Sequence, residues 1–158
     1  LMLTETFLAW CAGFLDGDGS LMLQVKKRKD GALKRRFMLT ICFYQDTRHE
    51  EPLRWIRDTL GIGYLSRRND GMSELRINGY EQVARILKDL SPFLKFKKRQ
   101  AEAMYDAAML LARVGRKRLA PRELRKLVDW MLMIQSENYV ARRKKTRAEL
   151  MKLFDLTP

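Results

Sequence analysis

Two aspartates at close spacing, Asp16 and Asp18, are the side chains of this sequence best suited to chemistry. Gly17 lies between them and Gly19 follows them. Carboxylates suit Mg²⁺, which is usually held by one or two of them together with water and phosphate oxygens. Divalent ions held in this way activate water and stabilise the leaving oxygen in phosphodiester hydrolysis. The pattern favours metal-assisted chemistry, and the alternative for such a string in isolation is a simple acidic turn.

A helix over residues 4–16 is expected to carry the acidic pair. Thr4 is a candidate N-cap, and the glycines at the far end permit backbone angles that other residues resist. Asp18 would lie past the helix end, where its carboxylate can reach a phosphate, whereas Asp16 can instead satisfy backbone groups at the turn. The apolar residues with helical spacing are Phe7, Leu8, Cys11, Phe14 and Leu15.

The sequence after this helix predicts an α+β fold. Alternating apolar and polar residues indicate strands, two of them around turn residues at 69–71, and longer periodic stretches indicate helices. The expected order is α-β-β-α-β-β-α followed by more helix, with a four-stranded antiparallel sheet within residues 20–78 and helices over 80–158. The whole chain, 1–158, is expected to form one domain. The expected segments are strands 20–28, 36–44, 64–68 and 73–78, and helices 50–60, 81–90 and 98–114, with further helices starting at Pro121 and after Thr146.

The charge of the chain predicts a polyanionic partner. The 158 residues include 32 Lys and Arg against 19 Asp and Glu, a net charge of +13, so nucleic acid is the first expectation and a generally basic surface the alternative. No apolar run could cross a bilayer, and no cationic leader precedes the first helix, which predicts an intracellular, unsecreted protein. Cys11 and Cys42 lie in apolar patterns and are expected to be buried, reduced thiols.

One face of the predicted sheet carries side chains that could read base edges in a DNA major groove, with an ordinary solvated face as the alternative. These candidate DNA-binding residues are Gln24, Lys26, Arg28, Arg36, Cys42, Tyr44, Ser66, Arg68, Glu74 and Arg76. Basic residues in loops are expected to contact phosphates, with solvated loop charge or a nuclear-localisation signal as alternatives. They are Lys34, Arg116, Lys117, Arg118, Arg143, Lys144 and Lys145.

The segment Cys11–Gly19 matches the LAGLIDADG motif at Ala12, Gly13, Asp16, Asp18 and Gly19, and the motif occurs once. The chain resembles the single-motif LAGLIDADG homing endonucleases, particularly the homodimeric intron-encoded type.

Other segments match this family in order along the chain. They are Gln45 after the second strand, Gly61–Tyr64 before the third strand, and the run Pro92–Gln100. The resemblance implies that Gln45 acts near the nucleophilic water and that Lys97 is the active-site cation. The family's basic residue after the second strand corresponds to His49 or to the adjacent Arg48. The alternatives are an exposed residue at a helix start for His49 and a solvated charge for Lys97.

The resemblance implies a metal-dependent endonuclease that hydrolyses both strands of a long, near-palindromic DNA duplex and leaves staggered ends. Mg²⁺ or Mn²⁺ would be held by Asp18 and Gly17, and Ca²⁺ would bind without supporting cleavage. A homodimer is expected through the first helix, with two sheets forming a saddle over the DNA. No organic cofactor and no membrane are expected, and the location would be a chloroplast or mitochondrion. The expected dimer contacts are Ala9, Ala12, Gly13 and Asp16.

Two other function classes remain open from the sequence. A DNA-binding protein or intron-RNA maturase of the same fold would keep the basic sheet and lack cleavage activity. A basic component of a ribonucleoprotein would share the net charge of +13 without discriminating RNA from DNA. Cleavage in Mg²⁺ separates the first expectation from both.

Overall fold

The computed structural model describes residues 2–30, 35–138 and 144–157. Its helices and strands follow the predicted order, and three more helices follow α3. The elements are α1 (Glu5–Asp18), β1 (Gly19–Lys27), β2 (Arg35–Asp46), the 3₁₀ turn η1 (Thr47–His49), α2 (Glu51–Leu60), β3 (Tyr64–Arg67), β4 (Met72–Asn78), α3 (Tyr80–Leu90), the 3₁₀ turn η2 (Ser91–Phe93), α4 (Lys98–Val114), α5 (Pro121–Glu137) and α6 (Arg147–Leu153).

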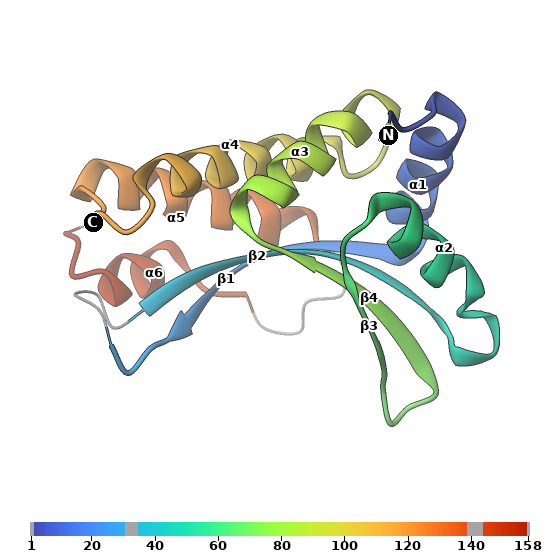
Figure 1. Ribbon diagram of the computed structural model, residues 1–158. Helices are drawn as coiled ribbons and strands as arrows, with labels where there is room; N and C mark the ends of the chain where they lie inside the picture. The colour runs from blue at the N-terminus through green and yellow to red at the C-terminus, as the bar shows by residue number, and fades with distance from the viewer. Residues whose placement is uncertain (1, 31–34, 139–143, 158) are drawn as a thin grey trace.

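The four strands form one antiparallel sheet with the order β1-β2-β4-β3. Phe43 in the long strand β2 lies opposite Gly19 of β1 on one side and Leu75 of β4 on the other. Figure 1 shows the sheet arched beneath α3 and α4, with its concave side facing away from them. The predicted α+β architecture with a saddle-shaped antiparallel sheet is confirmed.

Apolar and polar residues alternate along the strands, and this makes the side of the sheet that faces the helices apolar. Successive strand side chains point to opposite faces, so the apolar residues at every second position gather on the side that packs against the helices. Burial of each such side chain contributes about 1.5–3 kcal/mol. The buried strand residues on this side are Leu21, Leu23, Phe37, Leu39, Ile41, Phe43, Leu75 and Ile77.

Helix α1 extends further than the sequence suggested. Thr4 caps it as expected, its Oγ1 accepting the Phe7 N–H at 3.1 Å. The helix does not end at residue 16 but includes Gly17 and Asp18, and the N–H of Gly19 completes the last turn by donating to the Leu15 carbonyl. The prediction that Gly17 ends the helix is therefore wrong. Of Gly17 and Gly19, it is Gly19 that close approach requires, because a Cβ there would lie 2.8 Å from the Leu15 carbonyl oxygen, whereas a Cβ at Gly17 would meet no atom within 4 Å.

A 3₁₀ turn that the sequence did not predict precedes α2. Asp46 caps this turn, η1, by accepting the Arg48 N–H at 2.8 Å. The predicted stop of α2 at Gly61 is confirmed, since Gly61 adopts φ 69°, a left-handed conformation that glycine tolerates. The capping box of Thr146 and Glu149 at the start of α6 is also present. Among the described helices, none has the length and apolarity needed to cross a membrane.

Candidate active site and nucleic-acid interface

Asp16 connects the end of α1 to the segment that follows η2. Its carboxylate oxygens accept the backbone N–H groups of Lys95 at 2.7 Å and of Lys97 at 2.9 Å. The Lys97 Nζ also donates to the Asp16 carbonyl oxygen at 2.9 Å. Asp16 does satisfy backbone groups, but they belong to this distant segment and not to the acidic turn. Both of its carboxylate oxygens are thus used within the chain.

The Asp16 contacts place Lys97 beside the acidic end of α1. Burial lowers the pKa of the half-buried Lys97 ammonium, while the negative charges of Asp16 and Asp18 act in the opposite direction. The predicted active-site cation Lys97 therefore lies near the acidic end of α1, bonded to Asp16 and within electrostatic range of Asp18. A cation held at this place can stabilise negative charge that develops on a phosphate.

Asp18 is exposed at the last residue of α1, not beyond the helix end as the sequence suggested. The helix continues because Gly17 accommodates helical geometry, and its Cβ position is open. Within the part of the chain that the structure describes, no cluster of three His, Cys, Asp or Glu side chains could hold a metal ion. A cation at Asp18 would need further oxygen donors from water, from a phosphate or from a second subunit.

Gln45 lies close to the same end of α1. On β2 it is two residues beyond Phe43, which pairs with Gly19, so both glutamine and phenylalanine point to the helix side of the sheet. Its side-chain oxygen accepts the Asp46 N–H at 2.9 Å, and the residue is partly exposed. The side-chain nitrogen of Gln45 therefore remains as a donor for a ligand.

Arg48 and His49 follow in η1, and both are exposed. Arg48 forms an ion pair with Asp46 at 2.9 Å. The hydrogen bond from the Arg48 guanidinium lowers the pKa of Asp46 to about 2. Because this exposed ion pair can be exchanged for a phosphate at little cost, both Arg48 and His49 remain candidates for the basic role in the site.

The strand register brings the candidate DNA-binding side chains to one face of the sheet. Lys26 lies opposite Arg36 across β1 and β2. Tyr44 lies opposite Glu74, and Glu74 opposite Ser66, across β2, β4 and β3. Paired residues of an antiparallel sheet share a face, so the predicted grouping is confirmed for these positions.

Three members of this face are less available than the sequence suggested. Cys42 is fully buried between its cross-strand neighbours Ser20 and Arg76, so the prediction that it contacts DNA is wrong. Burial raises the pKa of the Cys42 thiol to about 11. Glu74 is 8% exposed and accepts a hydrogen bond from the Arg76 Nε at 3.0 Å, so both are already paired with each other.

Arginines near the strand ends are held in place by neighbouring aspartates. Arg28 pairs with Asp30 at 3.2 Å, and Arg68 pairs with Asp70 at 2.6 Å. Exposed ion pairs contribute only about 0–1 kcal/mol. Each arginine can therefore exchange its aspartate for a phosphate or a base edge at little cost.

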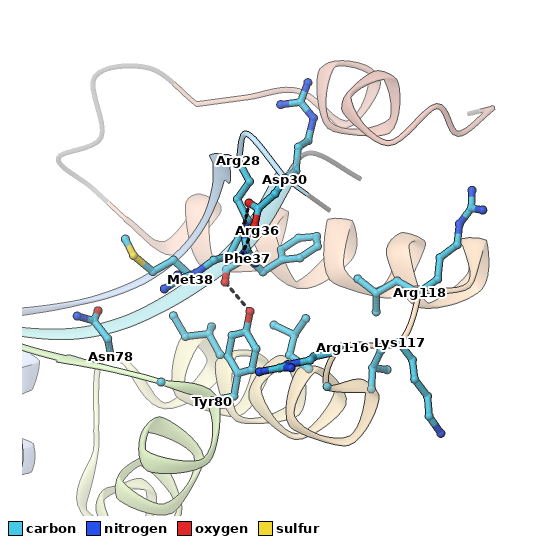
Figure 2. Close-up of a pocket in the computed structure, with 17 residues that line it drawn as sticks. Arg28, Asp30, Arg36, Phe37, Met38, Asn78, Tyr80, Arg116, Lys117 and Arg118 are labelled. Carbon is cyan, nitrogen blue, oxygen red and sulfur yellow. Dashed lines mark hydrogen bonds and ion pairs between the residues drawn. The ribbon is translucent and has the colours of Figure 1, made fainter. Parts of the chain in front are cut away.

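A basic cavity of about 720 Å³ opens where the β1–β2 end of the sheet meets the segment after α4. Figure 2 shows the Arg116–Arg118 segment on one side and Arg28 and Arg36 on the other, with the Tyr80 hydroxyl donating to the Phe37 carbonyl at 2.6 Å. The basic lining residues are Arg28, Arg35, Arg36, Arg116, Lys117 and Arg118, and the acidic one is Asp30. The predicted phosphate contacts Arg116–Arg118 thus converge with Arg28 and Arg36 of the predicted DNA-reading face, and Arg35 joins them.

The other predicted loop contacts lie near the start of α6. Lys144 and Lys145 are exposed, and the Lys145 backbone is held by two hydrogen bonds of 3.1 Å to the Gln135 side chain. Lys34 and Arg143 lie outside the described residues.

The proposed dimer stripe on α1 is only partly exposed. Ala9 and Gly13 lie on the open side of the helix, whereas Ala12 is fully buried in the core of its own subunit. The expectation that Ala12 contacts a second copy is wrong, because it falls on the face of α1 that packs against the sheet and the other helices. A Cβ at Gly13 or Gly17 would meet no atom within 4 Å.

Glu50 is a buried acidic residue that the sequence reasoning missed. It precedes α2 and looked like an ordinary acidic residue at a helix start, but it is 6% exposed and bonds to Arg54, Arg67 and Ser73. Arg54 lies four residues after Glu50 and Arg67 lies 17 residues after it. Only the contact between Glu50 and Arg54 could be anticipated from helical spacing.

Comparisons with known proteins agree with this geometry. A family model described as LAGLIDADG endonuclease matches residues 11–103, more than half of the chain. The chain is 37% identical to the DNA endonuclease I-CvuI of Chlorella vulgaris over 94 residues, which cover 60% of this chain and 58% of that relative. It is 28% identical to the DNA endonuclease I-CreI of Chlamydomonas reinhardtii over 151 residues, covering 96% and 90%.

The fold matches solved structures over nearly its full length. The crystal structure of the homing endonuclease I-CvuI in complex with its target in the presence of calcium superposes with a TM-score of 0.81 at 26% identity, covering 96% of both chains. The archaeal intron-encoded homing endonuclease I-Vdi141I complexed with DNA shares the fold with a TM-score of 0.81 at 22% identity. The acidic helix end, the antiparallel sheet and the family match lead to one conclusion: this chain belongs to the LAGLIDADG endonuclease family.

Proposed function

We propose that the chain is a site-specific DNA endonuclease of the homing type. It hydrolyses both strands of a long, near-palindromic duplex and leaves staggered ends. The observation that carries this proposal is the exposed Asp18 carboxylate beside the half-buried Lys97, at one end of a sheet whose other face presents paired basic residues. The family membership and the DNA complexes of I-CvuI and I-Vdi141I support it.

The donors at the end of α1 fit a hard divalent cation. Asp18 offers an exposed carboxylate, and Gly17 lies in the last helical turn, where carbonyl oxygens lack intrahelical partners. Oxygen donors suit Mg²⁺ or Mn²⁺. When bound, the cation supplies an activated water and stabilises the leaving oxygen. Ca²⁺ is proposed to support binding only; I-CvuI was crystallised with its own target in calcium, and with the I-CreI target in magnesium, where the DNA was not cleaved.

The chain's own residues arrange the reacting groups. The Gln45 amide nitrogen, left free by the bond that its oxygen makes to Asp46, donates a hydrogen bond that orients the attacking water. The Lys97 ammonium stabilises negative charge on the scissile phosphate, and His49 or Arg48 assists from η1. The proton of the attacking water passes to solvent, and no side chain has to act as a general base.

The active unit is proposed to be a homodimer. One acidic turn per chain supplies too few donors, and a second copy across a two-fold axis would double them. The open side of α1, with Ala9, Gly13 and Gly17, allows close approach of a second helix. Trp10 and Trp55, which are 43% and 46% exposed, lie beside this stripe with ring centroids 5.0 Å apart. Exposed apolar groups of this kind favour an interface.

DNA is proposed to lie along the concave side of the sheet. Side chains such as Gln24, Arg36 and Arg68 face the bases, while the basic cavity around Arg116 holds phosphates beyond them. An organellar location belongs to the same proposal. It rests on the resemblance to intron-encoded endonucleases.

The proposal is tested with a library of duplexes that contain randomised sequence. The purified protein is incubated with this library in Mg²⁺, in Ca²⁺ and in a chelator, and the cut ends are sequenced. Cleavage at one sequence class in Mg²⁺ alone, abolished in Asp18→Asn with DNA binding retained, is the expected result. Binding without cleavage in every metal would indicate a DNA-binding protein of this fold. Cutting that persists in the chelator or in Asp18→Asn would overturn the metal role.

A further inference from the structure

Glu50 is the centre of a hydrogen-bond cluster that joins three elements. Its Oε1 accepts from the Arg54 Nη2 at 2.6 Å and from the Arg67 Nη2 at 2.7 Å. Its Oε2 accepts from the Arg67 Nε at 3.1 Å and from the Ser73 Oγ at 2.6 Å. The donors lie on α2, β3 and β4, so one carboxylate fastens the start of α2 to the β3–β4 hairpin.

The cluster needs the charge of Glu50. Two guanidinium groups surround one carboxylate, and hydrogen bonds from Arg67, Ser73 and Arg54 hold the pKa of Glu50 well below its usual range. Arg67 is bidentate, a geometry that fixes orientation as well as attraction. An uncharged side chain of the same size would leave two arginines with a single weak acceptor and would loosen the cluster.

The same cluster reaches the turn that carries the candidate active-site residues. The Ser73 Oγ, whose proton goes to Glu50, lies 3.0 Å from the Thr47 Oγ1 and accepts from it. The Thr47 N–H donates to the Gly71 carbonyl at 2.9 Å. Ser73 also pairs with Gln45 across β2 and β4. Glu50 therefore reaches the segment from Gln45 to His49 through Ser73, and it directly follows His49 in the chain.

We propose that Glu50 is a positioning residue that couples the β3–β4 hairpin to the segment carrying Gln45 and His49. This inference rests on the proposed endonuclease function. The hairpin carries Ser66 and Arg68 of the DNA-reading face, and through Glu50 it is joined to the residues that act on the phosphate. The position of the DNA against the hairpin therefore affects the positions of Gln45 and His49. The reaction rate is sensitive to small displacements of such groups.

The inference separates DNA binding from the rate of cleavage. Glu50→Gln keeps the side-chain size and removes the charge, so Gln45 and His49 lose their fixed position while the sheet face remains. The cleavage rate of bound DNA is expected to fall roughly 10- to 100-fold. Asp58→Asn is the matched control. Like Glu50→Gln it removes one negative charge, but at an exposed residue of α2 that forms an ion pair with Arg57. It should cleave like the wild type, and both variants should bind DNA equally.

The experiment uses single-turnover cleavage of the duplex that the wild-type protein selects from the randomised library. The wild type, Glu50→Gln, Asp58→Asn, Gln45→Ala and the Glu50→Gln/Gln45→Ala double variant are compared, with binding measured in Ca²⁺. If Glu50 acts through Gln45, the double variant should be hardly slower than Gln45→Ala alone. The Thr47 amide should also exchange its hydrogen faster in Glu50→Gln. Ser73→Ala keeps both ion pairs of Glu50 and removes the Ser73 bonds to Glu50 and to Thr47, so it should show a smaller loss of rate and serves if Glu50→Gln does not fold.

The outcomes distinguish this inference from the proposed function. A wild-type protein that cleaves nothing would overturn the endonuclease proposal and this inference with it. A wild-type protein that cleaves, with Glu50→Gln and Ser73→Ala cleaving at the same rate, would overturn this inference alone. Equal losses in Glu50→Gln and Asp58→Asn, or rate losses that simply multiply in the double variant, would also overturn it.

Discussion

The Asp16 carboxylate accepts the backbone N–H of Lys97 at 2.9 Å, although the two residues are 81 positions apart in the sequence. The Lys97 side chain returns to the Asp16 carbonyl oxygen at 2.9 Å. One aspartate of the acidic pair therefore builds the site by holding a distant cation, and the other, Asp18, remains exposed for a ligand. This division of roles explains why the helix ends with two acidic residues at this spacing.

Replacing Asp16 should disturb the position of Lys97. In Asp16→Asn the amide can accept only one of the two N–H groups, so the free energy of unfolding should fall by about 1–2 kcal/mol. Cleavage of bound DNA should slow while affinity is maintained, because the sheet face is unchanged. Chemical denaturation and single-turnover kinetics measure the two effects. Asp89→Asn, an equal charge change at an exposed position on α3, serves as control. If Asp16→Asn is as stable as this control, the hydrogen bonds from Lys95 and Lys97 to the Asp16 carboxylate do not stabilise the protein.

A larger side chain on the open side of α1 should weaken the dimer without destabilising the individual subunits. A Cβ at Gly13 meets no atom within 4 Å, so Gly13→Leu has room in the monomer and removes an unfavourable helical glycine. The dimer should weaken and cleavage should be lost or reduced to nicking. Sedimentation with and without DNA gives the oligomeric state. Ser136→Leu, at an exposed site on α5, should remain dimeric. Unchanged dimerisation of Gly13→Leu would place the interface elsewhere.

Features set by local pattern could be predicted from the sequence. The alternation of Phe37, Leu39 and Ile41 fixes which face of β2 packs against helices, and the structure confirms it. Capping follows the same logic, since Thr4 and Thr146 act on groups three residues away. The motif and the family's ordered residues pointed to Asp18 and Lys97, and the structure places both at the end of α1, while their roles stay predictions. In each case the information lies within a few residues or within a known pattern.

Features set by distant neighbours could not be predicted. The predicted burial of the Cys42 thiol is confirmed, but the strand alternation places this residue on the open face, where its cover comes from residues of β1 and β4 that pair with it. The partners of Asp16 and Glu50 come from segments that only the folded chain brings together. Glycine often interrupts helices, so the sequence predicts that α1 ends before Gly17. In the structure the helix continues through Gly17 and ends at Gly19.

The buried thiols should make the protein sensitive to alkali. Burial raises the pKa of Cys11 to about 12 and that of Cys42 to about 11, above the ordinary value of 9.0 that applies in the unfolded chain. As the pH rises above about 9, the thiols of the unfolded chain lose their protons while those of the folded protein keep them. The free energy of unfolding should therefore fall above this pH. Cys11→Ala/Cys42→Ala should show a smaller decline in denaturation midpoints. Native thiols should react slowly with Ellman's reagent at neutral pH, and rapid labelling of the folded protein would contradict their burial.

The basic cavity should contribute directly to the salt dependence of DNA binding. Each phosphate that the protein neutralises contributes about 0.9 to the slope of log affinity against log salt, so several contacts per subunit imply a loss of about 10³ or more between 50 and 200 mM. Arg116→Ala/Lys117→Ala removes two cations that line the cavity, and the slope should fall with little change in sequence preference. Arg85→Ala removes an exposed cation on α3 and should leave the slope unchanged. Titrations at several salt concentrations measure the slopes; equal slopes for the cavity variant and the wild type would mean that DNA phosphates do not enter this cavity.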